Sequence, residues 1–302
     1  NGSVVMPRYP VYVISKGRFA NCLTAKFLDR DGVDFRLVVE PQERDQYASR
    51  FGPQRILTLP FANLGRGSIP ARNWVWEHSK SAGHERHWIL DDNIYHISRR
   101  FKGIRIACNA EIAFAATEDF VDRYENIAVA GMNYTMFMPD GTSHPPFRTN
   151  VHVYSCLLIW NDLPYRWRGR YNEDTDLCLQ VLSGGWCTVL TNAFLINKIT
   201  TMVMKGGNSA ELYKGDGRLK MARALERKWP GVVEVRRRFK RPQHVIKYAW
   251  RRFDTPLKLK PGIDLNSLPP IDQYGLELTA VKPVKSESLK ELLNEGRNNN
   301  GS

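Results

Sequence analysis

The sequence predicts an α/β protein with a doubly wound, mixed but mostly parallel sheet that is flanked by helices. Short apolar runs alternate with segments of helical spacing through the first half of the chain. Repeated β-α-β units of this kind build parallel sheets. In addition, the apolar run that ends at Leu90 is followed directly by Asp91, Asp92 and Asn93. Open α/β sheets bind polar ligands at the carboxyl ends of their strands, where such residues belong.

Four strands and three helices are expected in the first half of the chain. The strands are short apolar runs, expected at 11–15, 35–40, 55–60 and 87–90. The helices carry apolar residues three and four positions apart, and they are expected at 22–28, 42–51 and 71–79. The stretch between the third strand and the third helix has neither pattern and is expected to be a loop.

The second half mixes the two kinds of element less regularly. Helices are expected at 110–124, 173–182 and 219–228, strands at 127–131, 151–160 and 188–196, and a glycine-containing loop at 200–212. Beyond Lys258 the proline and polar content rises, so we expect an extended or partly disordered tail. The chain then divides into a main domain at 8–215, a basic helical extension packed on it at 216–260, and a tail at 261–302.

Composition favours a cytoplasmic protein. A chain of 302 residues can bury a complete hydrophobic core. The five cysteines are odd in number and include no C-x-x-C pair, so reduced thiols are expected. No run approaches the roughly 18 to 20 apolar residues of a membrane helix. The chain does not open with a charged and then apolar signal segment either.

The positive charge of the chain is concentrated near its C-terminus. The formal net charge is +13, and between Arg218 and Lys260 fifteen lysines and arginines face only three acidic residues. Aromatic residues such as Trp229 and Phe239 lie among them. This mixture suits a nucleic acid, because cations bind phosphates and rings stack on bases, although a solvated basic face is the alternative. The candidate ligands of nucleic acid are Arg236, Arg237, Arg238, Lys240, Arg241, Arg251 and Arg252.

The acidic residues after the fourth strand are the best candidates for a metal site. Carboxylate and amide oxygens suit Mg²⁺ or Mn²⁺ that is shared with phosphates. Neighbouring strand residues point to opposite sides, so we expect Asp92 to meet the metal and Asp91 to orient a ribose or a bound water. Asn93 and His244 are further candidate ligands. The alternatives are an Asp-Asn turn for the acidic run and a packing or capping role for the histidine.

Residues at the other predicted strand ends favour a phosphate-bearing ligand at the same edge. Ser15, Lys16 and Arg18 follow the first strand, and Glu40 follows the second. They would bring a hydroxyl, two cations and a carboxylate to the ligand. A polar turn between strand and helix is an equally good interpretation of this segment when it is taken alone.

Two glycine-containing segments add candidate binding residues. Arg72 and Asn73 fall in the first turn of a helix, where free N–H groups and the helix dipole favour phosphate. Lys205 precedes two glycines that could act as hinges of a lid, although a plain surface loop fits equally well. The glycine spacing differs from the G-x-G-x-x-G of dinucleotide-binding enzymes, which disfavours nicotinamide chemistry.

A second acidic run, from Asn172 to Asp176, opens a predicted helix. Acidic side chains in a first helical turn often only complement the helix dipole, and this interpretation is preferred for Asp176. For Asp174 we prefer the role of a general base that removes a proton from an acceptor hydroxyl.

Together these motifs resemble those of GT-A glycosyltransferases. They are the Ser15-Lys16-Gly17-Arg18 opening, Ala71-Arg72-Asn73, Leu90-Asp91-Asp92-Asn93 as a variant of the D-x-D element, and Asn172-Glu173-Asp174 as the E-D element of inverting enzymes. More narrowly, 88–93 and 171–176 are similar to the TET/JBP-associated glycosyltransferases, which are encoded largely by phages. The resemblance covers roughly 11–198. Asn93 stands where many GT-A enzymes have a second aspartate, which would weaken a metal site.

The resemblance implies an inverting, metal-dependent enzyme whose donor is a uridine diphosphate sugar. UDP-glucose is the first candidate donor and UDP-N-acetylglucosamine the second. Asp174 and Glu173 would be catalytic, Arg72 would assist the leaving diphosphate, and the acceptor would be a hydroxymethylated pyrimidine in DNA. We expect that base to be flipped or single-stranded, because a stacked base cannot easily enter a pocket. The rival hypotheses are transfer to Ser or Thr of a protein, and a nucleic-acid-binding protein with a decayed enzyme fold.

Overall fold

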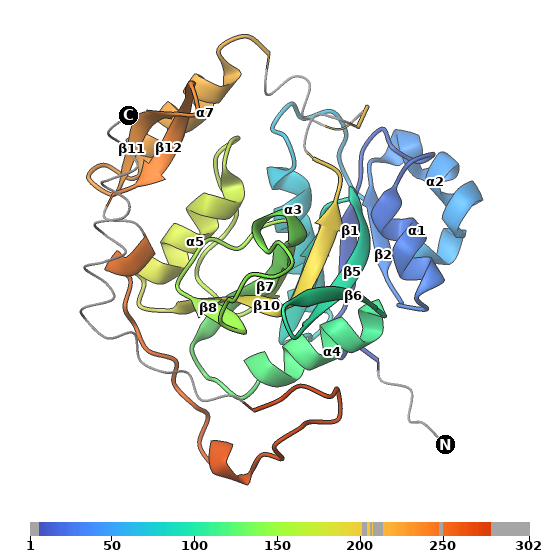
Figure 1. The fold of residues 1–302 in the computed structure, drawn as a ribbon. Helices are drawn as coiled ribbons and strands as arrows, with labels where there is room; N and C mark the ends of the chain where they lie inside the picture. The colour runs from blue at the N-terminus through green and yellow to red at the C-terminus, as the bar shows by residue number, and fades with distance from the viewer. Residues whose placement is uncertain (1–5, 201–203, 206, 208–213, 248–249, 279–302) are drawn as a thin grey trace. The chain divides into compact units, whose positions relative to one another are not determined.

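The structure is a computed structural model that describes residues 6–200, 204–205, 207, 214–247 and 250–278. Its main sheet has ten strands, which are β1 (Val11–Ile14), β2 (Arg36–Val39), β3 (Ile56–Thr58), β4 (Arg86–Leu90), β5 (Ile94–Phe101), β6 (Ile104–Cys108), β7 (Ile127–Tyr134), β8 (Phe147–Thr149), β9 (Cys156–Trp160) and β10 (Cys187–Lys198). The described helices are α1 (Leu23–Arg30), α2 (Arg44–Phe51), α3 (Ile69–Ser81), α4 (Ala110–Val121), α5 (Glu173–Ser183) and α7 (Gly217–Lys228). Figure 1 shows the helices around the sheet.

The sheet is mixed, and its parallel part lies at one end. The strand order is β3-β2-β1-β4-β9-β7-β10-β5-β6, with β8 paired to β10. The strands β3, β2, β1 and β4 are parallel neighbours, as the repeated β-α-β pattern predicts. Farther along, β4 and β7 both pair antiparallel with β9, whereas β7 and β10 are parallel. The predicted mixed α/β sheet flanked by helices is therefore confirmed.

Apolar side chains on both faces of the sheet form the core. Neighbouring strand residues point to opposite faces. Accordingly, Ile89 packs in a cluster with Trp76 of α3 and Leu177 of α5, whereas the ring of Trp88 lies 4.7 Å from that of Phe114 in α4. The strand β4 is buried along its whole length. Its end, where the acidic run begins, is therefore held by packing from both sides.

Local sequence explains where the helices that border the site begin. Proline at the start of α3 fixes a helical φ and has no N–H to leave unpaired. The helix α5 begins after Asn172, whose left-handed backbone (φ 52°, ψ 40°) turns the chain sharply into the helix. The side chain of Asn172 donates a hydrogen bond to the carbonyl oxygen of Met221 in α7 at 3.1 Å. Both helices therefore start at fixed points beside the carboxyl ends of the strands.

Some elements differ from the sequence prediction. The strand expected at 151–160 begins only at Cys156, because Ser155 has a left-handed φ of 63° that interrupts extended backbone. The hairpin of β5 and β6 was not predicted, since its polar side chains show no regular alternation. Among its described residues, the α-helical part of the basic extension is α7. It continues as a hairpin of β11 (Val233–Arg238) and β12 (Arg241–Ile246), in which the run of arginines is accommodated because these side chains are exposed.

The chain forms two compact units, at 1–263 and 264–302. Within the described part of the second unit, a short 3₁₀ turn at Leu265–Ser267 is followed by a bridge between Ile271 and Glu277. The division of the first 263 residues into a main domain and an extension remains a prediction. Among the described helices none combines the length and the apolar character needed to cross a membrane.

Gly131 provides a test of the packing between β7 and β9. A Cβ at this position would collide with the carbonyl oxygen of Cys156 and with the side chain of Val153. We expect Gly131→Ala to lower the free energy of unfolding by about 1 to 3 kcal/mol, because the strands must separate to admit the methyl group. Urea unfolding measures this loss. A midpoint equal to that of the wild type would contradict the close approach of the strands.

Candidate active site

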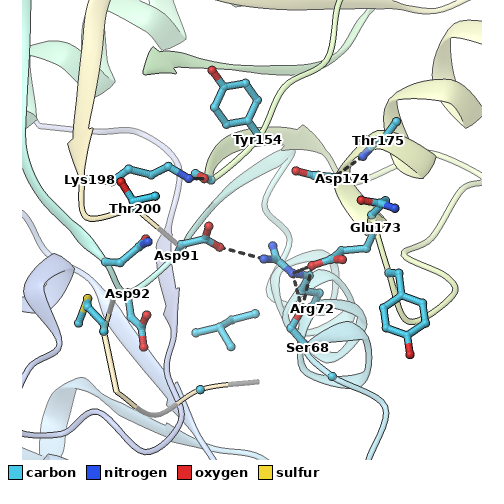
Figure 2. A pocket seen from close by; sticks show the side chains of 18 of the residues that line it. Ser68, Arg72, Asp91, Asp92, Tyr154, Glu173, Asp174, Thr175, Lys198 and Thr200 are labelled. Atoms are coloured by element: carbon cyan, nitrogen blue, oxygen red, sulfur yellow. Dashed lines mark hydrogen bonds and ion pairs between the residues drawn. The ribbon is translucent and has the colours of Figure 1, made fainter. Parts of the chain in front are cut away.

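A cavity of about 540 Å³ opens at the carboxyl ends of β1 and β4. It is also bordered by the starts of α3 and α5 and by the end of β10, so segments far apart in the sequence meet there (Figure 2). Of the predicted site residues, those that line it are Ser15, Lys16, Arg18, Arg72, Asp91, Asp92, Asn93, Glu173, Asp174 and His244. These candidates were expected to meet at the ends of the strands, and they lie together around one cavity.

The guanidinium of Arg72 links three elements of the site. It donates hydrogen bonds to Asp91 Oδ1 at 2.9 Å and to Ser68 Oγ at 2.9 Å, and its Nε lies 3.8 Å from Glu173 Oε1. The ring of Trp167 lies 4.7 Å from its central carbon. Burial opposes the charge, but the surrounding carboxylates raise the pKa of Arg72 above its usual value. A permanent cation is therefore fixed in the wall of the cavity (Figure 2).

The two acidic residues at the end of β4 have different surroundings. Asp92 is enclosed, and its carboxylate accepts hydrogen bonds from Ser15 Oγ at 2.7 Å and Arg18 Nη1 at 2.5 Å. Burial raises the pKa of Asp92, although Arg18 acts in the opposite direction. The side chain of Asp91 is 33% exposed, against 7% for Asp92. Asp91 is thus the more accessible carboxylate, whereas both oxygens of Asp92 already have partners within the protein.

Asn93 combines a satisfied amide nitrogen with an unsatisfied oxygen. Its Nδ2 donates a hydrogen bond to the carbonyl oxygen of Ile199 at 2.9 Å. Its Oδ1 is buried and has no hydrogen-bond partner among the described residues. A buried acceptor without a partner is costly, so this oxygen suits a ligand that brings a donor or a cation.

Asp174 is paired with a histidine that the sequence analysis did not select. His152 Nε2 lies 3.1 Å from Asp174 Oδ2, and the backbone N–H of Thr175 donates to Asp174 Oδ1 at 2.8 Å. Burial works against ionisation, yet these contacts hold the pKa of Asp174 well below its usual range. In neighbouring Glu173 burial raises the pKa, and the charge of Asp174 adds to that effect. The two adjacent acids therefore have opposite tendencies to hold a proton.

Lys198 and Tyr154 are further site residues that the sequence analysis missed. Lys198 Nζ donates to Ser155 Oγ at 2.9 Å and lies 5.4 Å from the ring of Tyr134 and 5.8 Å from that of Tyr154. Burial raises the pKa of the Tyr154 phenol, which remains a neutral donor to Asn133 Oδ1. The position of Lys198 at the end of a strand could have identified it as a site residue. The strand was expected to end at residue 196, so this position was not recognised.

The sequence of residues 9–207 matches the TET-Associated Glycosyltransferase family. The chain belongs to this family. It is accordingly a glycosyltransferase. A proposed nucleotide-diphospho-sugar transferase from Desulfovibrio desulfuricans G20 has a similar structure, with 12% identity, a TM-score of 0.39, and coverage of 74% of this chain and 99% of that chain. A comparison with curated proteins finds no match.

A second cavity of about 250 Å³ adjoins the first in this glycosyltransferase. Lys16 and Arg170 line both cavities, and Glu40 lines the second. Glu40 accepts hydrogen bonds from Lys16 Nζ at 3.0 Å and from the backbone N–H of Asn63 at 3.2 Å. Although burial opposes it, these contacts and one from Gln42 lower the pKa of Glu40. The residues predicted at the ends of the first two strands therefore form one continuous surface.

Other predicted site residues of the glycosyltransferase lie in different surroundings. Asn73 makes both of its side-chain hydrogen bonds to the backbone of Trp167, at 2.8 and 3.0 Å, so it supports the loop that carries the ring under Arg72. Lys205 contributes its carbonyl oxygen, which accepts from Arg18 Nε at 3.2 Å. The rest of the predicted lid lies largely outside the described residues. Burial lowers the pKa of His244, which reaches the cavity from β12.

The predicted nucleic-acid ligands lie beside this site, on the basic extension. Arg236, Arg237 and Arg238 belong to β11, and Lys240 and Arg241 form the turn and the start of β12. Arg251 and Arg252 are exposed on a short 3₁₀ turn, Trp250–Arg252. The ring of Trp250 stacks on His152 with centroids 6.0 Å apart. The extension thus contributes directly to the surroundings of the Asp174–His152 pair.

The enclosure of Asp92 can be tested by a double-mutant cycle with Arg18. Arg18→Met should lower the free energy of unfolding by about 3 kcal/mol, because it leaves a buried carboxylate without its cation. Adding Asp92→Asn should restore much of that loss, since the uncompensated charge is removed. Denaturant unfolding of the wild type, both single variants and the double variant measures the coupling. Additive effects would mean that the two side chains do not form an internal ion pair.

Proposed function

We propose that the protein transfers a sugar from a uridine diphosphate sugar to the hydroxyl of a 5-hydroxymethylpyrimidine in DNA, with inversion at the anomeric carbon. UDP-glucose is the first candidate donor. The main support for this proposal is the Asp174–His152 pair, which lines the same cavity as the cations Arg72 and Lys198. A proton acceptor and cations in one cavity are what displacement of an anionic leaving group by a hydroxyl requires.

The second cavity suits the nucleoside part of the donor. It contains a carboxylate, Glu40, and an exposed amide, Asn63, which can accept or donate hydrogen bonds to a ribose and a base. Lys16 and Arg170 line both cavities, so they would offer cations where the nucleoside of the donor joins its diphosphate. We therefore assign the nucleoside to the smaller cavity and the sugar to the larger one.

The diphosphate would lie between Lys198, the start of α3 and the end of β4. Arg72 is fixed by Asp91 and Ser68, so it needs no reorganisation when negative charge develops on the leaving group. Lys198, the last residue of β10, adds a second cation to the cavity. These side chains would favour departure of the diphosphate with the electron pair of the broken sugar–oxygen bond.

A divalent metal ion fits this part of the site as a partner shared with the donor. In the described part of the chain no three acidic, histidine or cysteine side chains converge as a metal cage. Mg²⁺ is, however, commonly held by one or two protein carboxylates together with substrate phosphates. Asp91 is accessible and Asn93 Oδ1 is a buried oxygen without a partner, so these two residues would hold the ion. When bound, it would neutralise charge on the diphosphate.

The Asp174–His152 pair would receive the proton of the acceptor hydroxyl. As the hydroxyl oxygen bonds to the anomeric carbon, its proton passes to the pair, which shares it across the contact of 3.1 Å. Asp174 alone is a weak base, because its contacts stabilise the ionised form. The histidine beside it adds a second proton acceptor, and the ring of Trp250 limits its movement.

The acceptor assignment is tested by mass spectrometry of nucleosides. Hydroxymethylated DNA is incubated with the enzyme, Mn²⁺ and a mixture of UDP-sugars, and is then digested. We expect a hexose adduct on the hydroxymethylpyrimidine, and the mass of the adduct identifies the sugar. A protein mixture without DNA, incubated with the same UDP-sugars in labelled form, serves as the control. Label on Ser or Thr of protein, with none on DNA, would overturn the DNA acceptor.

The proton acceptor is tested by variants of Asp174 and His152. Asp174→Asn should lower kcat by about 100-fold or more, because general-base catalysis contributes roughly 10² to 10⁴. His152→Ala should lower kcat less, since Asp174 remains. The thermal shift caused by UDP should be retained in both variants. His144→Ala, which changes an exposed histidine outside the lining of the cavity, is the matched control. Full activity of Asp174→Asn would remove this residue from the mechanism.

A further inference from the structure

The hairpin of β11 and β12 ends in an exposed aromatic ring. Phe239 is 88% exposed, the highest value among the exposed large apolar residues of the described chain. It shares a two-residue turn with Lys240, and both have left-handed φ values, of 50° and 60°. Turns of this type favour Asn and Gly, so two bulky residues here cost conformational energy. Phe239 is therefore exposed to solvent at a turn position where Asn or Gly would make the fold more stable.

The base of this hairpin is anchored in the core. Val233 and Ile246 are directly paired across the strands, and both are buried with Leu179 of α5 and Leu225 of α7. The backbone N–H of Val235 also donates to Glu226 of α7 at 3.0 Å. The hairpin is thus fixed at the end opposite its turn.

One face of the hairpin connects the turn with the cavity. Val235 pairs with His244, and Arg237 pairs with Pro242, so these four side chains share a face. His244 lines the cavity. Phe239 is five residues farther along the ribbon, which corresponds to about 15 Å at the usual rise of a strand. The exposed ring and the wall of the active site therefore belong to one short, continuous ribbon.

The turn is surrounded by positive charge. From Val233 to Ile246 there are five cationic residues and one acidic residue. In the part of the chain that the structure describes, Arg236 is paired with Glu234, whereas Arg237, Arg238, Lys240 and Arg241 make no ion pair. An aromatic tip with unpaired cations on both sides is complementary to a stacked polyanion, whose phosphates flank a stack of flat bases.

We propose that the hairpin inserts Phe239 into the base stack of duplex DNA and so helps the acceptor nucleotide to leave the helix and enter the cavity beside His244. This inference rests on the proposed function, because it assumes a DNA acceptor. The major groove admits a two-stranded ribbon. Apolar side chains that enter between base steps unstack them at a cost of a few kcal/mol. The neighbouring arginines, which contact phosphates, offset that cost.

The test compares duplex and single-stranded acceptors. The wild type and Phe239→Ala are assayed on the same hydroxymethylated oligonucleotide, alone and annealed to its complement. We expect Phe239→Ala to lower kcat/KM on the duplex at least tenfold and to leave it within twofold on the single strand, where no base must be unstacked. Phe239→Trp, which keeps a flat ring, should retain most duplex activity. Phe101→Ala removes another exposed ring, on β5, and should change neither value.

Each outcome bears on one of the two proposals. Equal activity of Phe239→Ala and wild type on the duplex, or an equal loss on both acceptors, would overturn the proposed insertion of Phe239, which we call the wedge. Neither result would contradict DNA as the acceptor. If the wild type modifies neither acceptor, the proposed function fails. The wedge is then judged from 2-aminopurine fluorescence in a bound duplex, which should rise with the wild type and not with Phe239→Ala. Binding of wild type, but not Phe239→Ala, to anionic vesicles in preference to DNA would indicate a membrane-contacting tip and overturn the wedge.

Discussion

The site depends on the buried charge of Arg72. A guanidinium enclosed between α3, β4 and α5 is stable only because Asp91, Ser68 and Glu173 surround it. Removing Asp91 or Glu173 would weaken the compensation of this interior charge, and removing Ser68 would leave an N–H of the guanidinium without its acceptor. The same contacts fix the relative positions of the three elements that carry the acidic residues of the cavity. In this glycosyltransferase, the contacts that compensate the charge of Arg72 are therefore also the contacts that position α3, β4 and α5.

The neighbouring acids Asp91 and Asp92 directly follow β4, and their surroundings differ although both line the cavity. Asp92 joins Arg18, Ser15 and Tyr47 in a hydrogen-bond network in the wall of the cavity. Asp91 keeps an accessible oxygen beside Arg72. From the sequence, Asp92 was expected to meet a metal ion and Asp91 to orient a ribose or a bound water. Which acid is enclosed depends on the position of Arg18, and nothing in the local sequence specifies it.

Much of the fold and most of the candidate site could be predicted because parallel strands end at one edge. Ser15, Arg72 and Asp91 lie far apart in the chain, yet each follows an apolar run or opens a helix, and such positions converge. His152 follows no such rule. It lies in the irregular segment before β9, where left-handed φ values at Asn150 and Ser155 redirect the chain, and its meeting with Asp174 is set by tertiary packing. The basic hairpin was likewise hidden, because its polar strands carry little alternation.

The hydrogen bonds that join α5 to the extension mean that the basic segment is more than an appendage. Asn172, which precedes Glu173, is tied to Met221 of α7, and Asp176 accepts from Trp229 Nε1 at 2.8 Å and pairs with Arg168. A truncated enzyme that ended before α7 would leave the enclosed carboxylate of Asp176 short of a donor at the very helix that bears Asp174. Because these hydrogen bonds join the extension to α5, the stabilities of the two segments are coupled. Replacement of the extension by another segment would therefore require compensating changes in the first two turns of α5.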